Sequence, residues 1–156
     1  MFGRGLFLSA IVVGLDQLAK WFIRTEVMNP PHVIRVTPFF DLVLSWNRGI
    51  SFGLFGDVLS DGRWFFAGFS VVVTLALLFW LKKVDRPALM CAIAFVIGGA
   101  VGNIIDRVRF GAVVDFLYFH IEDHYFPAFN LADSAITIGV GLLLIDSLFA
   151  EPRSRK

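Results

Sequence analysis

Long apolar runs are separated by short polar segments along the chain, and this pattern predicts four membrane-spanning helices. The second and third runs contain no charged residue, and each is close to the ~20 residues that cross the hydrocarbon of a bilayer. The first run is interrupted by Asp16 and Lys20, and the fourth by Asp133 and Asp146. The predicted spans are residues 5–23, 64–81, 87–105 and 129–149.

The connection between the first two spans is rich in aromatic and β-branched residues, which favours a small sheet over a free loop. This outer β region covers residues 33–58, with a turn at Asn47-Arg48-Gly49. We expect it to rest on the outer leaflet, with Trp46, Phe52 and Phe55 in the interface.

The connection between the last two spans, residues 109–126, mixes aromatic and polar side chains and is expected to lie along the membrane surface. Its stretch His120–His124 is a candidate lid. The sequence therefore predicts a single domain over residues 1–156, a membrane all-α protein with a small β element. It would have four transmembrane helices, a β-sheet cradle on the outer face and a short interfacial helix or lid.

The composition indicates a membrane protein. Hydrophobic residues make up 57% of the 156 residues and mean hydropathy is +0.74. Soluble domains hold only about 45–50% apolar residues. The net charge of +1 gives no bulk electrostatic reason to expect nucleic acid as a partner. The single cysteine, Cys91, has no partner for an intrachain disulfide.

The basic residues set the expected orientation. Seven Lys and Arg fall on each side of the membrane, but short basic loops near span ends favour the cytoplasm. Both termini would then be cytoplasmic. The first span is expected to be retained, because Asp16, Gln17 and Lys20 follow its apolar start without a small-x-small cleavage site. The cytoplasmic basic residues would be Arg4, Lys82, Lys83, Arg86, Arg153, Arg155 and Lys156.

Two aspartates lie where a membrane protein should avoid charge. Asp115 interrupts the apolar run Ala112–Phe119, and Asp133 lies where the last span begins. A carboxylate there is costly unless it is protonated, paired or hydrated. Two carboxylates that share a proton divide the roles of acid and base between them. The pair makes the chain a candidate aspartyl hydrolase at a membrane surface.

Each aspartate also has a purely structural interpretation. Asn130 and Asp133 have the spacing of a capping box at a helix start, with Asn130 as the N-cap. Asp115 could be an edge residue of a strand that faces water.

The first span carries an acid and a base on one face, because Asp16 and Lys20 are four residues apart. They could form an internal ion pair that holds helices together. They could also order an active site from beneath, since Asp16 lies past the midplane toward the outside.

The third span ends in a small-residue face and a polar head. Gly98 and Gly102 form a small-xxx-small pair that allows another helix to approach closely. Asn103 must find a partner for its amide below the headgroups. Asp106 and Arg107 could be solvated charges at the span end, or could line up with Gly99 and Asn103 one turn apart.

A metal site is not expected. The sequence His120-Ile121-Glu122-Asp123-His124 has the order H-x-E-x-H, whereas zinc proteases use H-E-x-x-H or H-x-x-E-H. The chain also lacks a G-x-S-x-G elbow, a P-loop and a dinucleotide fingerprint. We therefore expect neither a metal nor an organic cofactor.

Five motifs occur in a fixed order along almost the whole chain, and together they are similar to those of one family. The chain resembles the lipoprotein signal peptidases, the bacterial signal peptidase II family. The motifs are Asp16–Lys20, Asn47–Gly49, Gly98–Arg107, Val114–Phe116 and Phe129–Ser134.

The resemblance implies an aspartyl endopeptidase of the bacterial cytoplasmic (inner) membrane with its active site at the outer face. Its partners would be membrane lipids and the signal peptides of lipid-modified prolipoproteins, cleaved just before the diacylglyceryl cysteine. Globomycin-type peptides would inhibit it. Separately from the resemblance, a monomer is the simpler expectation. The implied roles are catalytic for Asp115 and Asp133, substrate-binding for Asn47, Asn103, Arg107 and Asn130, and supporting for Asp16, Lys20, Asp106 and Gly99.

In this hypothesis one aspartate activates a water and the other donates a proton to the scissile carbonyl. The substrate's signal helix would enter laterally, beside the glycine face of the third span. The competing prediction is a small transporter or channel subunit in which Asp16, Lys20 and Asp133 form an ion or proton path. Four spans without a pair of broken helices argue against it.

Overall fold

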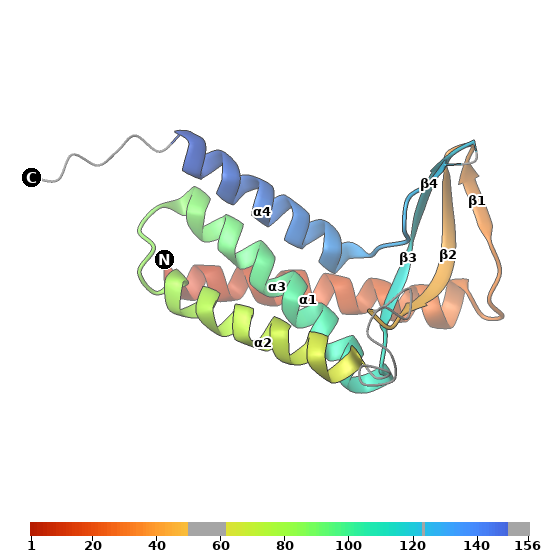
Figure 1. The fold of residues 1–156 in the computed structure, drawn as a ribbon, viewed down its shortest axis with the longest axis horizontal. Coiled ribbons are helices and arrows are strands. Elements are labelled where there is room, and N and C mark those ends of the chain that lie inside the picture. The colour runs from red at the N-terminus through yellow and green to blue at the C-terminus, as the bar shows by residue number, and fades with distance from the viewer. Residues whose placement is uncertain (50–61, 123, 150–156) are drawn as a thin grey trace, which may run out of the picture.

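The computed structural model describes residues 1–49, 62–122 and 124–149. Its four longest helices are apolar and long enough to cross a membrane, as predicted. They run side by side in Figure 1. α1 (Phe2–Phe22) continues into a π-helix, η1 (Ile23–Val27), and α2 (Gly62–Leu81), α3 (Pro87–Phe110) and α4 (Leu131–Phe149) follow. The third helix thus extends beyond its predicted end at residue 105.

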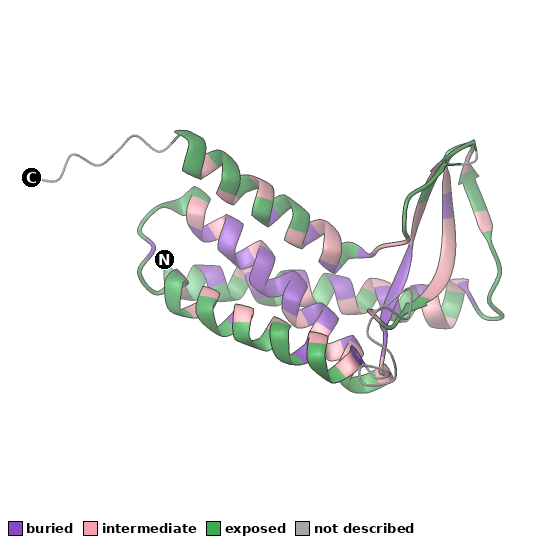
Figure 2. Cartoon of the chain, in the orientation of Figure 1, coloured by how far each residue is buried: buried purple, intermediate pink, exposed green. Residues whose placement is uncertain are grey.

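α3 is the central helix and packs against each of the other three. Figure 2 shows buried residues along most of its length, whereas α2 and α4 are largely exposed. Leu81, Ile93 and Ile97 form a core between α2 and α3. The exposed faces of α2 and α4 are rich in Phe, Leu, Ile and Val, which suits contact with lipid.

The glycines of α3 are sites of close helix approach, as the small-xxx-small pattern predicted. A Cβ on Gly98 would lie 2.6 Å from Val12 of α1, and one on Gly99 would meet the backbone carbonyl of Ala132 in α4. A Cβ on Gly102 would lie 2.6 Å from an oxygen of Asp16. Because α1 and α4 already fill this face, a substrate helix cannot pack against these glycines.

A four-stranded antiparallel sheet crosses the end of the bundle opposite the N-terminus (Figure 1). Its strands are β1 (Ile34–Thr37), β2 (Phe40–Asn47), β3 (Val113–Ile121) and β4 (His124–Tyr125), in that order. The predicted sheet is therefore confirmed over residues 34–47, and its place on the outer face stays a prediction. Residues 50–58 of the predicted region, with Phe52 and Phe55, lie outside the described residues.

The location of residues 109–126 along the membrane surface stays a prediction, and the first half of β3 is buried within the protein. Val113, Val114, Asp115 and Phe116 are buried, because β3 pairs with β2 and packs over the helix ends. Phe116 contacts Ile23 and Met28 beyond the C-terminal end of α1. The stretch around His120 and His124 forms the β3–β4 hairpin, and its function as a lid stays a prediction.

Candidate active site

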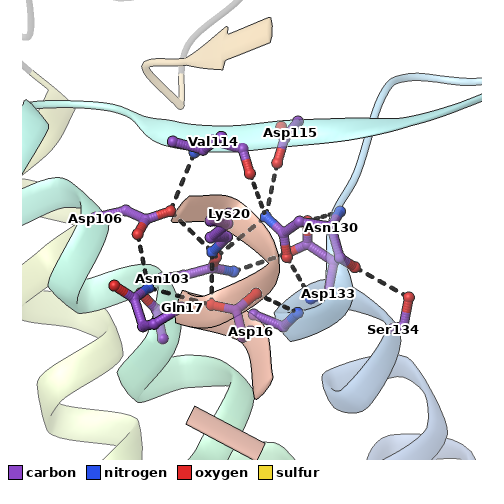
Figure 3. A network of polar contacts seen from close by, with 12 residues as sticks. Asp16, Gln17, Lys20, Asn103, Asp106, Val114, Asp115, Asn130, Asp133 and Ser134 are labelled. Atoms are coloured by element: carbon purple, nitrogen blue, oxygen red, sulfur yellow. Dashed lines mark hydrogen bonds and ion pairs between the residues drawn. The ribbon is translucent and has the colours of Figure 1, made fainter. Parts of the chain in front are cut away.

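Asp115 and Asp133 both hydrogen-bond to Asn130, Asp115 through its carboxyl and Asp133 through its carboxyl and its backbone N–H (Figure 3). Asp115 comes from β3, whereas Asp133 lies in the first turn of α4. Asn130 Nδ2 donates to Asp115 Oδ1 at 2.7 Å. Asn130 Oδ1 accepts from the Asp133 backbone N–H at 2.9 Å, and Asp133 Oδ2 accepts from the Asn130 backbone N–H at 3.2 Å.

The two hydrogen bonds between Asn130 and Asp133 are reciprocal and form the predicted capping box. The capping and active-site interpretations of Asp133 are therefore compatible. The residue before the cap is fixed as well: the Phe129 carbonyl accepts from Phe116 N at 3.0 Å, and Phe129 N donates to the Leu117 carbonyl at 3.0 Å. These bonds tie the start of α4 to β3.

The structure rejects the interpretation of Asp115 as an edge residue facing water, since it is only 1% exposed. This burial, together with the nearby charge of Asp133, raises the pKa of Asp115 to about 6. Hydrogen bonds from Asn47 and Asn130 and the charge of Lys20 lower it in part. A carboxyl group with such a pKa keeps its proton up to about pH 6, and its protonated form is still a minor species at neutral pH.

A polar pocket of about 360 Å³ opens beside Asp115. Asn47 lines it, in line with its predicted place at the site. Ser45 lines it too and lies opposite Asp115 in the β2–β3 pairing, a position that sequence reasoning missed. Its two-residue spacing from Asn47 on one strand face was the available signal. The full lining is Ser45, Trp46, Asn47, Arg48, Gly49, Asp115, Pro127 and Ala128.

A buried ion cluster lies next to the residues that precede the two aspartates. Lys20 Nζ is 2.8 Å from Asp16 Oδ2 and 2.8 Å from Asp106 Oδ2, and all three side chains are at most 3% exposed. The predicted pair of Asp16 and Lys20 is present. The interpretation of Asp106 as a solvated span-end charge is wrong, because it is fully buried.

Each member of this cluster also contacts the elements that carry the site. Asp16 Oδ1 accepts from Ala132 N at 2.9 Å, and Asp106 Oδ2 accepts from Val114 N at 3.1 Å. These are the neighbours in sequence of Asp133 and Asp115. Gln17, which sequence reasoning left without a role, donates to Asp106 Oδ1 at 2.8 Å.

The side-chain amide of Asn103 has buried hydrogen-bond partners, as its position in the third span predicts. Its Nδ2 donates to Asp133 Oδ1 at 2.7 Å, and its Oδ1 accepts from Lys20 at 3.0 Å. Arg107 is half-buried and lies within electrostatic range of both Asp115 and Asp133. Gly99 contributes by letting α4 approach α3 at Ala132.

The described residues 1–49, 62–122 and 124–149 contain no group of three or more His, Cys, Asp or Glu side chains placed to hold a metal. His120 instead lies 3.2 Å from Asp41 across the sheet.

Comparison with known proteins matches the chain to one family. The family model of signal peptidase (SPase) II matches residues 8–149. The chain belongs to the signal peptidase II family. It is 51% identical over 140 residues to the lipoprotein signal peptidase of Azoarcus sp. (strain BH72), covering 89% of this chain and 79% of the relative. It is 46% identical over 145 residues to that of Burkholderia multivorans, covering 92% and 86%.

The fold is also similar to that of solved structures. A bacterial membrane enzyme solved by the in meso method at 2.3 Å resolution superposes with a TM-score of 0.81 and 31% identity, covering 99% of this chain and 94% of that one. A second such structure, at 1.9 Å, gives a TM-score of 0.81 and 33% identity, covering 96% and 95%. None of these matches favours the transporter or channel alternative.

Proposed function

We propose that the chain is an aspartyl endopeptidase that removes the signal peptide of diacylglyceryl-modified prolipoproteins, just before the lipidated cysteine. Family membership supports the class of substrate. The observation that carries the chemistry is the joining of two carboxyl groups through Asn130, beside a polar pocket at the end of a membrane bundle. Globomycin-type peptides would compete for the same pocket.

The two aspartates would have different starting states. Asp115 is the group that holds a proton, because burial and the charge of Asp133 raise its pKa to about 6. Asp133 accepts N–H donors from Asn103 and from the Asn130 backbone, and an ionised carboxylate offers acceptors only. Asp115 is then the general acid and Asp133 the general base.

Hydrolysis would follow in two steps. Asp133 takes a proton from a water held between the two carboxyl groups while the hydroxyl adds to the scissile carbonyl carbon, and Asp115 protonates the carbonyl oxygen. The diol then collapses: Asp133 gives its proton to the leaving nitrogen, and Asp115 recovers one from a diol hydroxyl. The products are a free signal-peptide carboxyl and the α-amino group of the lipidated cysteine.

The proposed setting is the bacterial cytoplasmic (inner) membrane, with both termini in the cytoplasm and a monomeric enzyme. The loop between α2 and α3, with Lys82 and Lys83, lies at the end of the bundle opposite the sheet (Figure 1). This charge distribution supports an outer active site. The substrate's acyl chains would stay in the outer leaflet, while Asn47, Asn103, Arg107 and Asn130 bind its backbone and ester groups.

The decisive experiment compares cleavage of lipidated and unlipidated precursor peptides by purified enzyme. Asp115→Asn and Asp133→Asn should each remove cleavage of the lipidated peptide. Asp41→Asn is the matched control, since Asp41 is a buried aspartate of the same sheet outside the pocket. Near wild-type cleavage by either site variant contradicts the dyad. Ion conductance in liposomes without cleavage would instead support the channel.

A further inference from the structure

We propose that Lys20 is a positioning residue that orients the amides of Asn103 and Asn130, so that each aspartate faces an NH2 donor. The inference rests on the proposed function, because it assigns a role in that reaction to a side chain outside the pocket. It follows from donor and acceptor chemistry along one chain of contacts, drawn in Figure 3.

The first step is at the lysine itself. An ammonium group has three N–H donors and no acceptor. Lys20 Nζ, only 3% exposed, faces three oxygens: Asp16 Oδ2 and Asp106 Oδ2 at 2.8 Å, and Asn103 Oδ1 at 3.0 Å. Asn103 must therefore turn its oxygen, and not its nitrogen, toward Lys20.

The second step fixes the donor to Asp133. With its oxygen held by Lys20, Asn103 turns Nδ2 to Asp133 Oδ1 at 2.7 Å. The flipped amide would place NH2 against the ammonium and a carbonyl oxygen against the carboxylate. Both contacts would be repulsive, so one buried charge selects one of the two amide orientations.

The third step passes the orientation to Asn130. The same Asn103 Oδ1 accepts from Asn130 Nδ2 at 3.3 Å, which directs that nitrogen to the side of Asp115. Asn130 Nδ2 then donates to Asp115 Oδ1 at 2.7 Å, and its oxygen faces the Asp133 backbone N–H at 2.9 Å. Lys20 thus sets both amides without touching either carboxylate of the dyad.

Lys20 does not line the pocket and acts only through the two amides. Because Asn103 and Asn130 are also proposed to bind substrate, its loss should reduce kcat and raise KM, and the pH profile is the readout that isolates the positioning role. The Asn130 hydrogen bond and the Lys20 charge both lower the pKa of Asp115. Without Lys20, the alkaline limb of the pH profile should move to higher pH.

The test is Lys20→Met, which keeps an unbranched side chain and removes the donor. We expect kcat to fall by about 10- to 100-fold and the alkaline limb to rise by roughly one pH unit. Rates are normalised to folded protein. Lys20→Arg, which keeps charge and donors, should recover part of the rate and restore the limb.

The matched control is Ser9→Ala in the same α1–α3 contact. Ser9 Oγ donates to the Ala94 carbonyl at 2.9 Å, and its loss should lower stability without moving the pH limb. If Lys20→Met does not fold, the double variant Lys20→Met/Asp106→Asn keeps the net charge of the cluster and gives the same readout.

An unshifted limb in a folded Lys20 variant overturns the proposal and leaves Lys20 a structural ion pair. That result is distinct from failure of the proposed function, which would appear as cleavage by Asp115→Asn or Asp133→Asn.

Discussion

Replacing Asp115 by Asn should abolish cleavage and at the same time stabilise the protein at alkaline pH. The carboxyl is 1% exposed, so solvent gives little screening of its charge. Burial and the charge of Asp133 raise its pKa from the ordinary 3.8 to about 6. At about 1.4 kcal/mol per pKa unit, ionised Asp115 destabilises the folded state by ~3 kcal/mol. Asn carries no charge and can still accept from Asn130 through its oxygen.

The sign of the pH dependence follows from the two ionisation states. Unfolded Asp115 ionises above pH 3.8, whereas the folded carboxyl keeps its proton up to about 6. The penalty is therefore complete above about pH 6 and fades as pH falls toward 3.8. Asp115→Asn should gain ~3 kcal/mol at pH 8 and about 1 kcal/mol at pH 4.5.

Thermal unfolding of wild type and Asp115→Asn in the same detergent at both pH values measures this difference. The variant should unfold several degrees above wild type at pH 8, and the difference in unfolding temperature should be clearly smaller at pH 4.5. A difference of equal size at both pH values would refute the reasoning, because the carboxylate charge would not be its source. A variant less stable than wild type at pH 8 would refute it as well.

Three further outcomes are expected. Gly99→Ala should destabilise the fold by about 1–3 kcal/mol, since its Cβ would meet the Ala132 carbonyl. The control is Gly68→Ala, whose Cβ would have nothing within 4 Å and which should unfold at the wild-type temperature or slightly above. The value of kcat/KM should fall above about pH 6 as Asp115 loses its proton. The fall in kcat should occur at higher pH, because bound substrate excludes water. A flat profile from pH 5 to 8 would contradict the assignment of Asp115 as the acid. Asn130→Ala should lose both the helix cap and the donor to Asp115. We expect a loss of about 1 kcal/mol of stability and of most of the activity. A variant that keeps the wild-type rate would exclude Asn130 from the site.

Apolar run length was sufficient to predict the four spans, because lipid leaves few alternatives to helix. It misplaced the end of α3 for a physical reason. The predicted span ended at residue 105 because a charge follows, but Asp106 is buried against Lys20 and the helix continues to Phe110. An ion pair between two spans removes the penalty that run length alone assigns to a charge.

The burial of β3 could be predicted in part from the sequence. Val113, Val114 and Phe116 form an almost continuous apolar run, which is typical of a strand buried on both faces. The mixed polar composition further along hid this signal. The role of Ser45 had a weak signal, its two-residue spacing from Asn47 on one strand face, and the role of Gln17 had none. Their partners are 89 and 70 positions away in the chain, and only the packing of α1 on α3 and the β2–β3 pairing brings them together.

The capping box shows why structural and chemical interpretations of one residue need not compete. Asn130 caps α4 with its oxygen and donates to Asp115 with its nitrogen, so one amide serves both purposes. Asp133 caps with Oδ2 and accepts from Asn103 with Oδ1, so each oxygen has a separate function. An Asn at position 133 can still accept from the Asn130 backbone, but its NH2 group then faces Asn103 Nδ2, whereas an Ala keeps neither acceptor. Both variants should lose activity, and the stability that Asp133→Asn retains over Asp133→Ala measures the contribution of the cap.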